Sequence, residues 1–144
     1  MTKGQICLMA VIDKNKKEKK MKLINAEKAP AAIGPYCHAV VSGNFVFCSG
    51  QIALDPDTMT LTGDSVEIQT RQVMKNIEIV LEKAGTTMDK IIKTTVFLSD
   101  MNNFAEMNKV YEECLADHKP ARAAVEVSRL PKDALVEIEC IASF

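Results

Sequence analysis

The chain has 144 residues, of which 47% are hydrophobic, and its formal net charge is −1. This length and composition are typical of one domain that buries a core of its own without disulfide bonds. The balanced charge excludes a general attraction to nucleic acid or to a membrane surface, so neither is an expected partner. No run reaches the ~18 apolar residues that a membrane-spanning helix needs.

Five cysteines are present, an odd number, and no two of them form a CxxC pair. We expect reduced, mostly buried thiols, which favours a cytoplasmic location. Cys37 and His38 are neighbours in a predicted strand and therefore point to opposite faces, so they are poorly placed to bind one metal ion. The only other histidine is His118. The sequence therefore predicts no metal site.

Residues 1–20 differ from the rest of the chain. A lysine-rich charge run covers residues 14–20, and Met21 directly follows it. We interpret residues 1–20 as a disordered extension and residues 21–144 as a single domain.

After Met21, turn-forming residues separate the predicted strands and helices at regular intervals. Two short β-type runs, residues 37–42 and 45–49, are joined by Gly43-Asn44, which predicts a hairpin. A helix is expected to begin near Asp64, with Glu67 as its capping-box partner, and to end at Gly85. Its apolar residues recur at helical spacing: Val73, Ile77, Val80, Leu81 and Ala84.

The second half alternates strand and helix. Residues 91–99 are rich in β-branched side chains, and either Asp100 or Asn103 is expected to cap a second helix that ends before Pro120. Strands are then expected over residues 121–127 and 135–142. The predicted order is β-β-α-β-α-β-β, an α+β domain with two helices packed on one face of a mixed sheet.

Alternation along the strands predicts what the second face of the sheet carries. In the last strand, Val136, Ile138, Cys140 and Ala142 share the face that fits under the helices, whereas the other face mixes apolar side chains with Glu137 and Glu139. Since two helices cover one face only, the other face would be an exposed apolar patch of the kind that marks association. We therefore expect a homo-oligomer.

Arg122 and Glu137 are the leading candidates for chemistry. Small residues flank Arg122, and a guanidinium can grip a carboxylate by two parallel hydrogen bonds. Glu137 is expected on the same type of face in a neighbouring strand, where a partly desolvated carboxylate can act as a general base. Alternatively the two residues form ordinary ion pairs, with each other or with Lys132. Glu139 shares the face of Glu137, so periodicity does not distinguish these two glutamates.

Asn108 is an unusual residue for its place. It interrupts the apolar stripe of the second predicted helix, and a buried amide needs hydrogen-bond partners. Either it bonds the backbone of an adjacent loop or it orients a ligand.

Six motifs occur in an order that resembles the Rid (YjgF-like) family of proteins, over residues 22–144. They are Ala31-Ala32-Ile33-Gly34-Pro35-Tyr36, Ser49-Gly50-Gln51-Ile52, Lys93-Thr94-Thr95-Val96-Phe97-Leu98, Pro120-Ala121-Arg122, Arg129-Leu130-Pro131-Lys132-Asp133 and Glu137-Ile138-Glu139. The resemblance implies a chorismate-mutase-like α+β fold and a homotrimer with three ligand clefts at the subunit interfaces. It also implies an enamine/imine deaminase that hydrolyses 2-imino acids to 2-keto acids and ammonia without metal or cofactor.

The resemblance assigns roles to particular residues. Arg122 would hold the substrate carboxylate, and Glu137 would position or activate the attacking water. Tyr36 would wall the cleft from the adjacent subunit, and Ser49, Gly50 and Asn108 match substrate-binding positions. Departures from the family pattern lie at Ala123 and Ala124, where serine and cysteine are frequent, and at Cys37-His38, where Ser-Gln is frequent. These differences are expected to change the shape of the pocket and the mouth of the cleft.

Two other functions fit the resemblance. One is an endoribonuclease or translation inhibitor, which only the lysine-rich run of residues 14–20 favours. The other is a non-catalytic binder of small carboxylates, in which Arg122 would bind a ligand and Glu137 would be dispensable.

Overall fold

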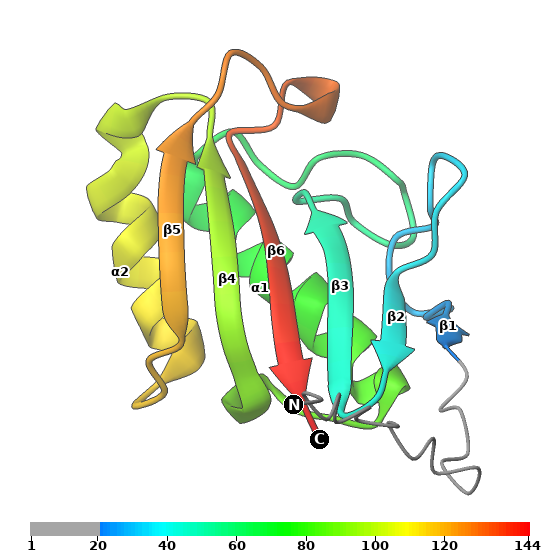
Figure 1. Cartoon of the computed structure of the whole chain (residues 1–144). Coiled ribbons are helices and arrows are strands. Elements are labelled where there is room, and N and C mark those ends of the chain that lie inside the picture. Colours follow the sequence, from blue (N-terminus) through cyan, green and yellow to red (C-terminus); the bar gives the residue numbers. More distant parts are fainter. Residues whose placement is uncertain (1–20) are drawn as a thin grey trace, which may run out of the picture.

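The computed structural model describes residues 21–144, which form one mixed sheet and two helices on its face (Figure 1). The predicted extension at residues 1–20 lies outside the described residues. The strands are β1 (Lys22–Ile24), β2 (Ala39–Ser42), β3 (Phe45–Gln51), β4 (Ile91–Leu98), β5 (Ala121–Glu126) and β6 (Val136–Ser143). The helices are α1 (Val66–Ala84) and α2 (Phe104–Leu115), with short 3₁₀ turns η1 (Met88–Lys90), η2 (Met101–Asn103) and η3 (Pro131–Asp133).

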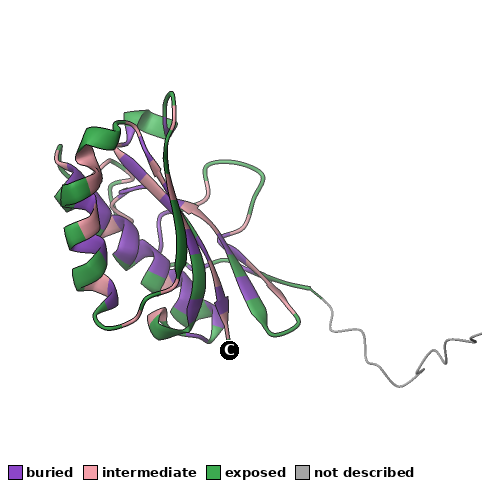
Figure 2. Cartoon of the chain, turned by 60° about the vertical axis from the view of Figure 1, so that its left-hand side comes forward, coloured by how far each residue is buried: buried purple, intermediate pink, exposed green. Residues whose placement is uncertain are grey.

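The spatial order of the strands is β1-β2-β3-β6-β4-β5. Only β4 and β5 pair in parallel, because α2 crosses between them, and all other neighbours are antiparallel. Both helices lie on the same side of the sheet, as predicted (Figures 1 and 2). The predicted order missed β1, because three residues at the edge of the sheet are too short to show a period.

Local signals place most boundaries within two residues. The β2–β3 hairpin turns at Gly43, which has a φ of +61°, and Ser42 pairs with Phe45. Helix α1 ends at Gly85 in the left-handed conformation, with a φ of 95°. The predicted capping box at Asp64 is wrong, since Ser65 is the N-cap and its side chain accepts a hydrogen bond from the N–H of Ile68. Serine and aspartate are both good N-cap residues, and the helix begins one residue later than predicted, so Ser65 is the cap.

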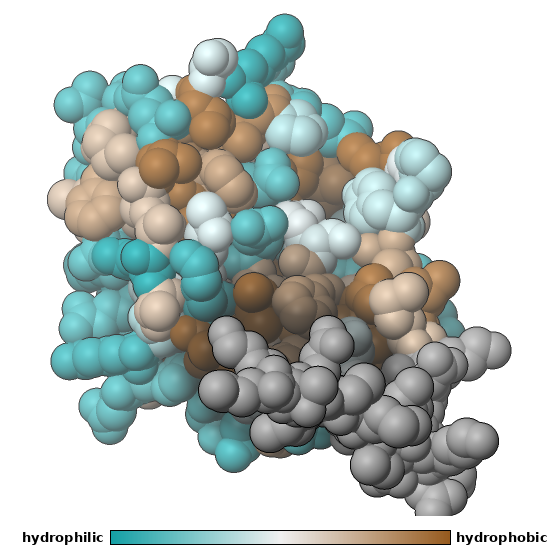
Figure 3. Space-filling view, in the orientation of Figure 1, coloured by the Kyte–Doolittle hydropathy of each residue, from teal (hydrophilic) through white to brown (hydrophobic). Residues whose placement is uncertain are grey.

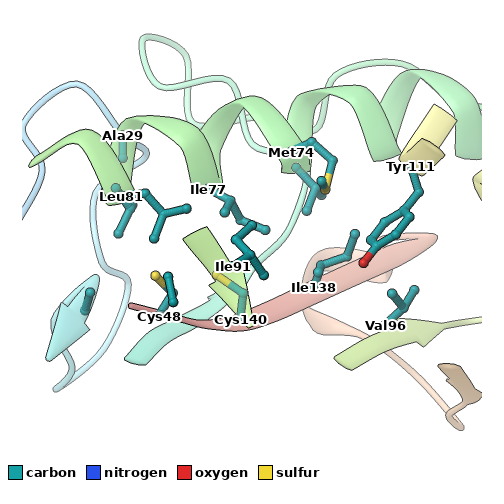
Figure 4. Packing of buried hydrophobic residues seen from close by; sticks show 14 of the residues in the cluster. Ala29, Cys48, Met74, Ile77, Leu81, Ile91, Val96, Tyr111, Ile138 and Cys140 are labelled. Atoms are coloured by element: carbon teal, nitrogen blue, oxygen red, sulfur yellow. The ribbon is translucent and has the colours of Figure 1, made fainter. Parts of the chain in front are cut away.

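The core lies between the helices and the sheet (Figure 4). The inward residues of β6 are all buried, as alternation predicted. Cys48 and Cys140 face each other across β3 and β6, and their mutual contact together with burial raises the pKa of the Cys140 thiol. Both cysteines are free and buried, while Cys37 and Cys114 are half-buried, and Cys7 lies outside the described residues.

The other face of the sheet is open and partly apolar. Phe45 and Phe47 on β3 are 46% and 44% exposed, and Val125 on β5 is also exposed. Figure 3, which looks onto this face, shows brown apolar surface between polar groups. The predicted mixed face is confirmed. Within residues 21–144, no helix combines the length and the apolar character that crossing a membrane requires.

The core predicts a sharp difference between two isoleucines of α1. Ile77 is 0% exposed, whereas Ile68 on the same helix is 50% exposed. We expect Ile77→Ala to lower the free energy of unfolding by about 2–5 kcal/mol, because it leaves a cavity between helix and sheet. The matched control Ile68→Ala should cost less than about 1 kcal/mol in the same urea titration. Equal losses would contradict the packing described here.

Candidate active site

Arg122 lies on the edge strand β5 and points to the helix-covered side of the sheet. It pairs in register with Thr94 of β4, a buried residue of that side. Its Nη1 donates a 2.7 Å hydrogen bond to Oδ1 of Asn108 on α2. The guanidinium carbon also lies 4.9 Å from the ring centre of Tyr111 and 5.5 Å from that of Phe104. These contacts fix the plane of the guanidinium.

The fixed guanidinium keeps donors available for a ligand. Among residues 21–144, Arg122 forms no ion pair, and its hydrogen bond leaves from Nη1 alone. A cavity of about 380 Å³ adjoins it, lined also by Asn108, Tyr111, Lys119 and Pro120. The arrangement therefore suits a planar carboxylate that accepts two parallel hydrogen bonds.

Tyr111 contacts the Arg122 guanidinium with its ring and β4 with its hydroxyl. Its hydroxyl and that of Thr94 are 2.7 Å apart, which ties α2 to β4 behind Arg122. Burial raises the pKa of Tyr111 above its ordinary value, so the ring stays neutral beneath the guanidinium. Asn108 accepts a hydrogen bond from Arg122 itself. Neither sequence interpretation of Asn108 named this partner.

Glu137 belongs to a second cavity, at the end of the sheet where β3 and β6 meet. This cavity has a volume of about 360 Å³ and is lined by Tyr36, Ser49, Gly50 and Glu137. The rest of its wall is largely apolar and comes from Pro30, Ala31, Ile33, Ile52, Leu54 and Pro131, together with the polar side chains of His38 and Gln51. A half-buried carboxylate thus faces a mostly apolar space.

Because Gly50 has no side chain, the Glu137 carboxylate can lie against its backbone. A Cβ atom at position 50 would lie 2.1 Å from Oε1 of Glu137, so any other residue would displace the carboxylate. The pairing of β3 with β6 shifts register between Cys48 and Gln51, which brings the Gly50 backbone close to Glu137. Beside it, the Ser49 hydroxyl donates a 2.7 Å hydrogen bond to the carbonyl of Cys37.

The structure also distinguishes the two glutamates of β6. Glu137 is half-buried in the cavity, whereas Glu139 is exposed and lines a different hollow with Lys93 and Thr95. Burial, and then the charge of Glu139, raise the pKa of Glu137 above its ordinary value. Of the two, Glu137 is the one suited to proton transfer.

The predicted site residues do not meet within one chain. Arg122 and Asn108 form one group, and Tyr36, Ser49, Gly50 and Glu137 form the other. The expectation that Arg122 and Glu137 share a face is wrong: Arg122 stands with Thr94 under α2, while Glu137 pairs with Phe97 on the open face. Strand β4 lies between β5 and β6, so the two strands are not neighbours either.

Sequence reasoning missed some members of the site. Phe104 and Tyr111 belong to the apolar stripe of the second predicted helix, and helical spacing alone does not reveal that an arginine on a strand contacts them. The resemblance places Cys37-His38 beside Tyr36 at the mouth of the cleft, and in the structure His38 lines the Glu137 cavity. No group of three or more metal-ligating side chains occurs within residues 21–144.

Comparison with known proteins gives a consistent picture. The family model described as endoribonuclease L-PSP matches residues 26–144. A RutC family protein from Pyrococcus horikoshii is 54% identical over 120 residues, which cover 83% of this chain and 95% of the relative. A 2-iminobutanoate/2-iminopropanoate deaminase from Escherichia coli is 48% identical over 124 residues, which cover 84% of this chain and 96% of the relative.

Solved structures show the same fold. A Rid family protein from Yersinia pestis superposes with a TM-score of 0.84 at 48% identity, covering 87% of this chain and all of that one. TdcF from E. coli, solved with bound serine, gives a TM-score of 0.81 at 43% identity and covers 85% and 98%. The α+β fold is the chorismate-mutase-like one predicted from the sequence. The chain therefore belongs to the Rid family, whose shared sequence model is described as endoribonuclease L-PSP.

Proposed function

We propose that this protein hydrolyses 2-imino acids, or their enamine tautomers, to 2-keto acids and ammonia. The observation that carries the proposal is the pair of complementary half-sites. One holds a fixed guanidinium with free donors, and the other holds a partly desolvated carboxylate in an apolar cavity. The E. coli and Salmonella typhimurium relatives named as deaminases, each 48% identical, support the same activity.

The two half-sites require a second copy of the chain. They lie on opposite faces of one sheet, so a small substrate cannot touch both within a single protomer. The exposed phenylalanines of β3 supply apolar area for association on the open face. We infer a homotrimer in which Arg122 of one copy completes the Glu137 cavity of the next.

The chemistry needs little from the protein. The carboxylate of the substrate binds Arg122, which sets the electrophilic imine carbon at the Glu137 cavity. Glu137 removes a proton from water as the oxygen attacks that carbon, and the C=N bond becomes a C–N bond. That proton then passes to nitrogen and gives a carbinolamine. The remaining hydroxyl proton follows it to nitrogen as the C–N bond breaks, ammonia leaves, and the C=O bond of the keto acid forms. No metal or cofactor takes part in these steps, and a cytoplasmic location stays a prediction.

Arg122 provides the first test of the proposal. We expect Arg122→Ala to lower kcat/KM roughly 100-fold or more, because two charge-assisted hydrogen bonds to the substrate are lost. Arg122→Lys should restore little, since an ammonium lacks the planar fork. The measurement follows the loss of 2-iminobutanoate produced by an amino-acid dehydratase.

The control is Arg71→Ala, which removes another arginine of the helix-bearing side, one paired with Glu113. It should retain wild-type rates. Equal imine decay with and without the wild-type protein would exclude the deaminase. Keto-acid binding that persists without hydrolysis would favour the carboxylate binder, and RNA cleavage that survives Arg122→Ala would favour the ribonuclease.

Mixing two inactive variants tests the shared site. Arg122→Ala and Glu137→Gln chains, refolded together in equal amounts, should recover activity, because each mixed trimer contains one site with both residues intact. Random assembly gives about one quarter of all sites. A site within one chain would recover nothing. Refolding each variant alone serves as the control, and the trimer itself is checked by sedimentation.

The pH profile tests the role of Glu137. Its carboxylate is the active form, so kcat/KM should fall as the pH drops through its raised pKa. Glu139→Gln removes the charge that contributes to this rise, and it should move the acidic limb of the profile to lower pH. Glu82→Gln, on helix α1, should leave the limb in place. A limb that is unchanged in Glu139→Gln would contradict this assignment.

A further inference from the structure

His38 occupies a place in the Glu137 cavity that the proposed chemistry does not use. The side chain is 5% exposed and both ring nitrogens have partners. Nδ1 lies 2.8 Å from the backbone nitrogen of Ala26, and Nε2 lies 2.8 Å from the carbonyl oxygen of Pro30. A single imidazole thus spans both ends of the turn at residues 26–30.

These two partners determine the tautomer of the ring. The Ala26 N–H can only donate, so Nδ1 must accept and carry no hydrogen. The Pro30 carbonyl can only accept, so Nε2 must carry the hydrogen and donate it. The neutral ring fits both contacts, whereas a protonated ring would set an N–H of Nδ1 against that of Ala26.

The backbone of His38 is fixed to the sheet on both sides. Its N–H donates to the carbonyl of Ile24 at 3.0 Å, and its carbonyl accepts from the N–H of Ser49 at 3.0 Å. The ring therefore connects the sheet to the turn at residues 26–30. This turn is followed in the chain by Ala31, Ile33 and Tyr36 of the cavity wall.

The wall itself has few other attachments. Within the described chain, residues 31–36 hydrogen-bond only among themselves: the N–H of Tyr36 to the carbonyl of Gly34, and the N–H of Ile33 to the Tyr36 hydroxyl. Hydrogen bonds tie the segment to the sheet at its two ends, through His38 at Pro30 and through Ser49 at Cys37. Loss of one end would free the wall that bears Ala31, Ile33 and Tyr36.

We propose that His38 is a positioning residue that holds the wall of the Glu137 cavity in its ligand-binding place through the two hydrogen bonds of its ring. The kinetic part of this inference rests on the proposed function, but the clamp itself does not.

Two variants test the hydrogen bonds of the ring. In His38→Gln, the amide can accept from Ala26 and donate to Pro30, whereas His38→Leu loses both bonds. Amide hydrogen exchange should show Ala26 protected in the wild type and in His38→Gln, and at least about fivefold less protected in His38→Leu. Thermal unfolding of each variant checks that the domain is folded.

Unchanged protection of Ala26 in a folded His38→Leu would overturn the clamp. Protection that is lost in His38→Gln would also overturn it, because that amide can still form both hydrogen bonds.

Kinetics with 2-iminobutanoate extend the test to function. We expect His38→Leu to raise KM about fivefold or more with a smaller change in kcat, and His38→Gln to stay within about twofold of wild-type KM. An active wild type with an unchanged KM in the leucine variant would overturn the positioning role. A wild type without imine hydrolysis would overturn the proposed function, and amide exchange would then decide the clamp alone.

Discussion

Only one face of this sheet is covered by helices, and side chains alternate between its two faces. On β5 this alternation sends Arg122 toward α2, and on β6 it sends Glu137 to the open side. No loop movement can change this, because a shift by one residue would expose the core residues of the same strands. The charged groups proposed to act together must therefore come from different copies of the chain. The proposed association and the proposed catalysis depend on the same geometric constraint.

Each half-site is arranged before any substrate arrives. The guanidinium of Arg122 rests against two aromatic rings and one amide, so little side-chain freedom remains to be lost on binding. In the other half, the Gly50 backbone lies so close to Glu137 that only glycine leaves space for the carboxylate. The raised pKa of Glu137 indicates that the fold holds this group in an environment that disfavours its charge, as a general base requires.

The proposed role of His38 belongs to the same cavity. Where the family often has glutamine, this chain has a side chain that can also satisfy one donor and one acceptor. The buried imidazole binds the turn at residues 26–30 through both nitrogens. A cavity wall that otherwise makes few hydrogen bonds to the sheet would then be held in place by this ring.

Much of this protein follows from its sequence. The glycines at positions 43 and 85 marked turn and helix end, and the alternation in β6 separated core from open face. Six ordered motifs indicated the family and hence the site residues. Such local signals are readable because their physical causes, backbone conformation and period, lie within a few neighbouring residues.

Only the tertiary structure decided how those residues are grouped. Sequence placed Arg122 and Glu137 in neighbouring strands on one face, but β4 inserts between β5 and β6, and the two side chains point apart. The sequence also left undecided which group Asn108 binds, whether Glu137 or Glu139 is the candidate base, and what His38 contacts. Partners across a sheet or between helix and strand depend on register and strand order, which come from packing of the whole domain rather than from any local run of residues.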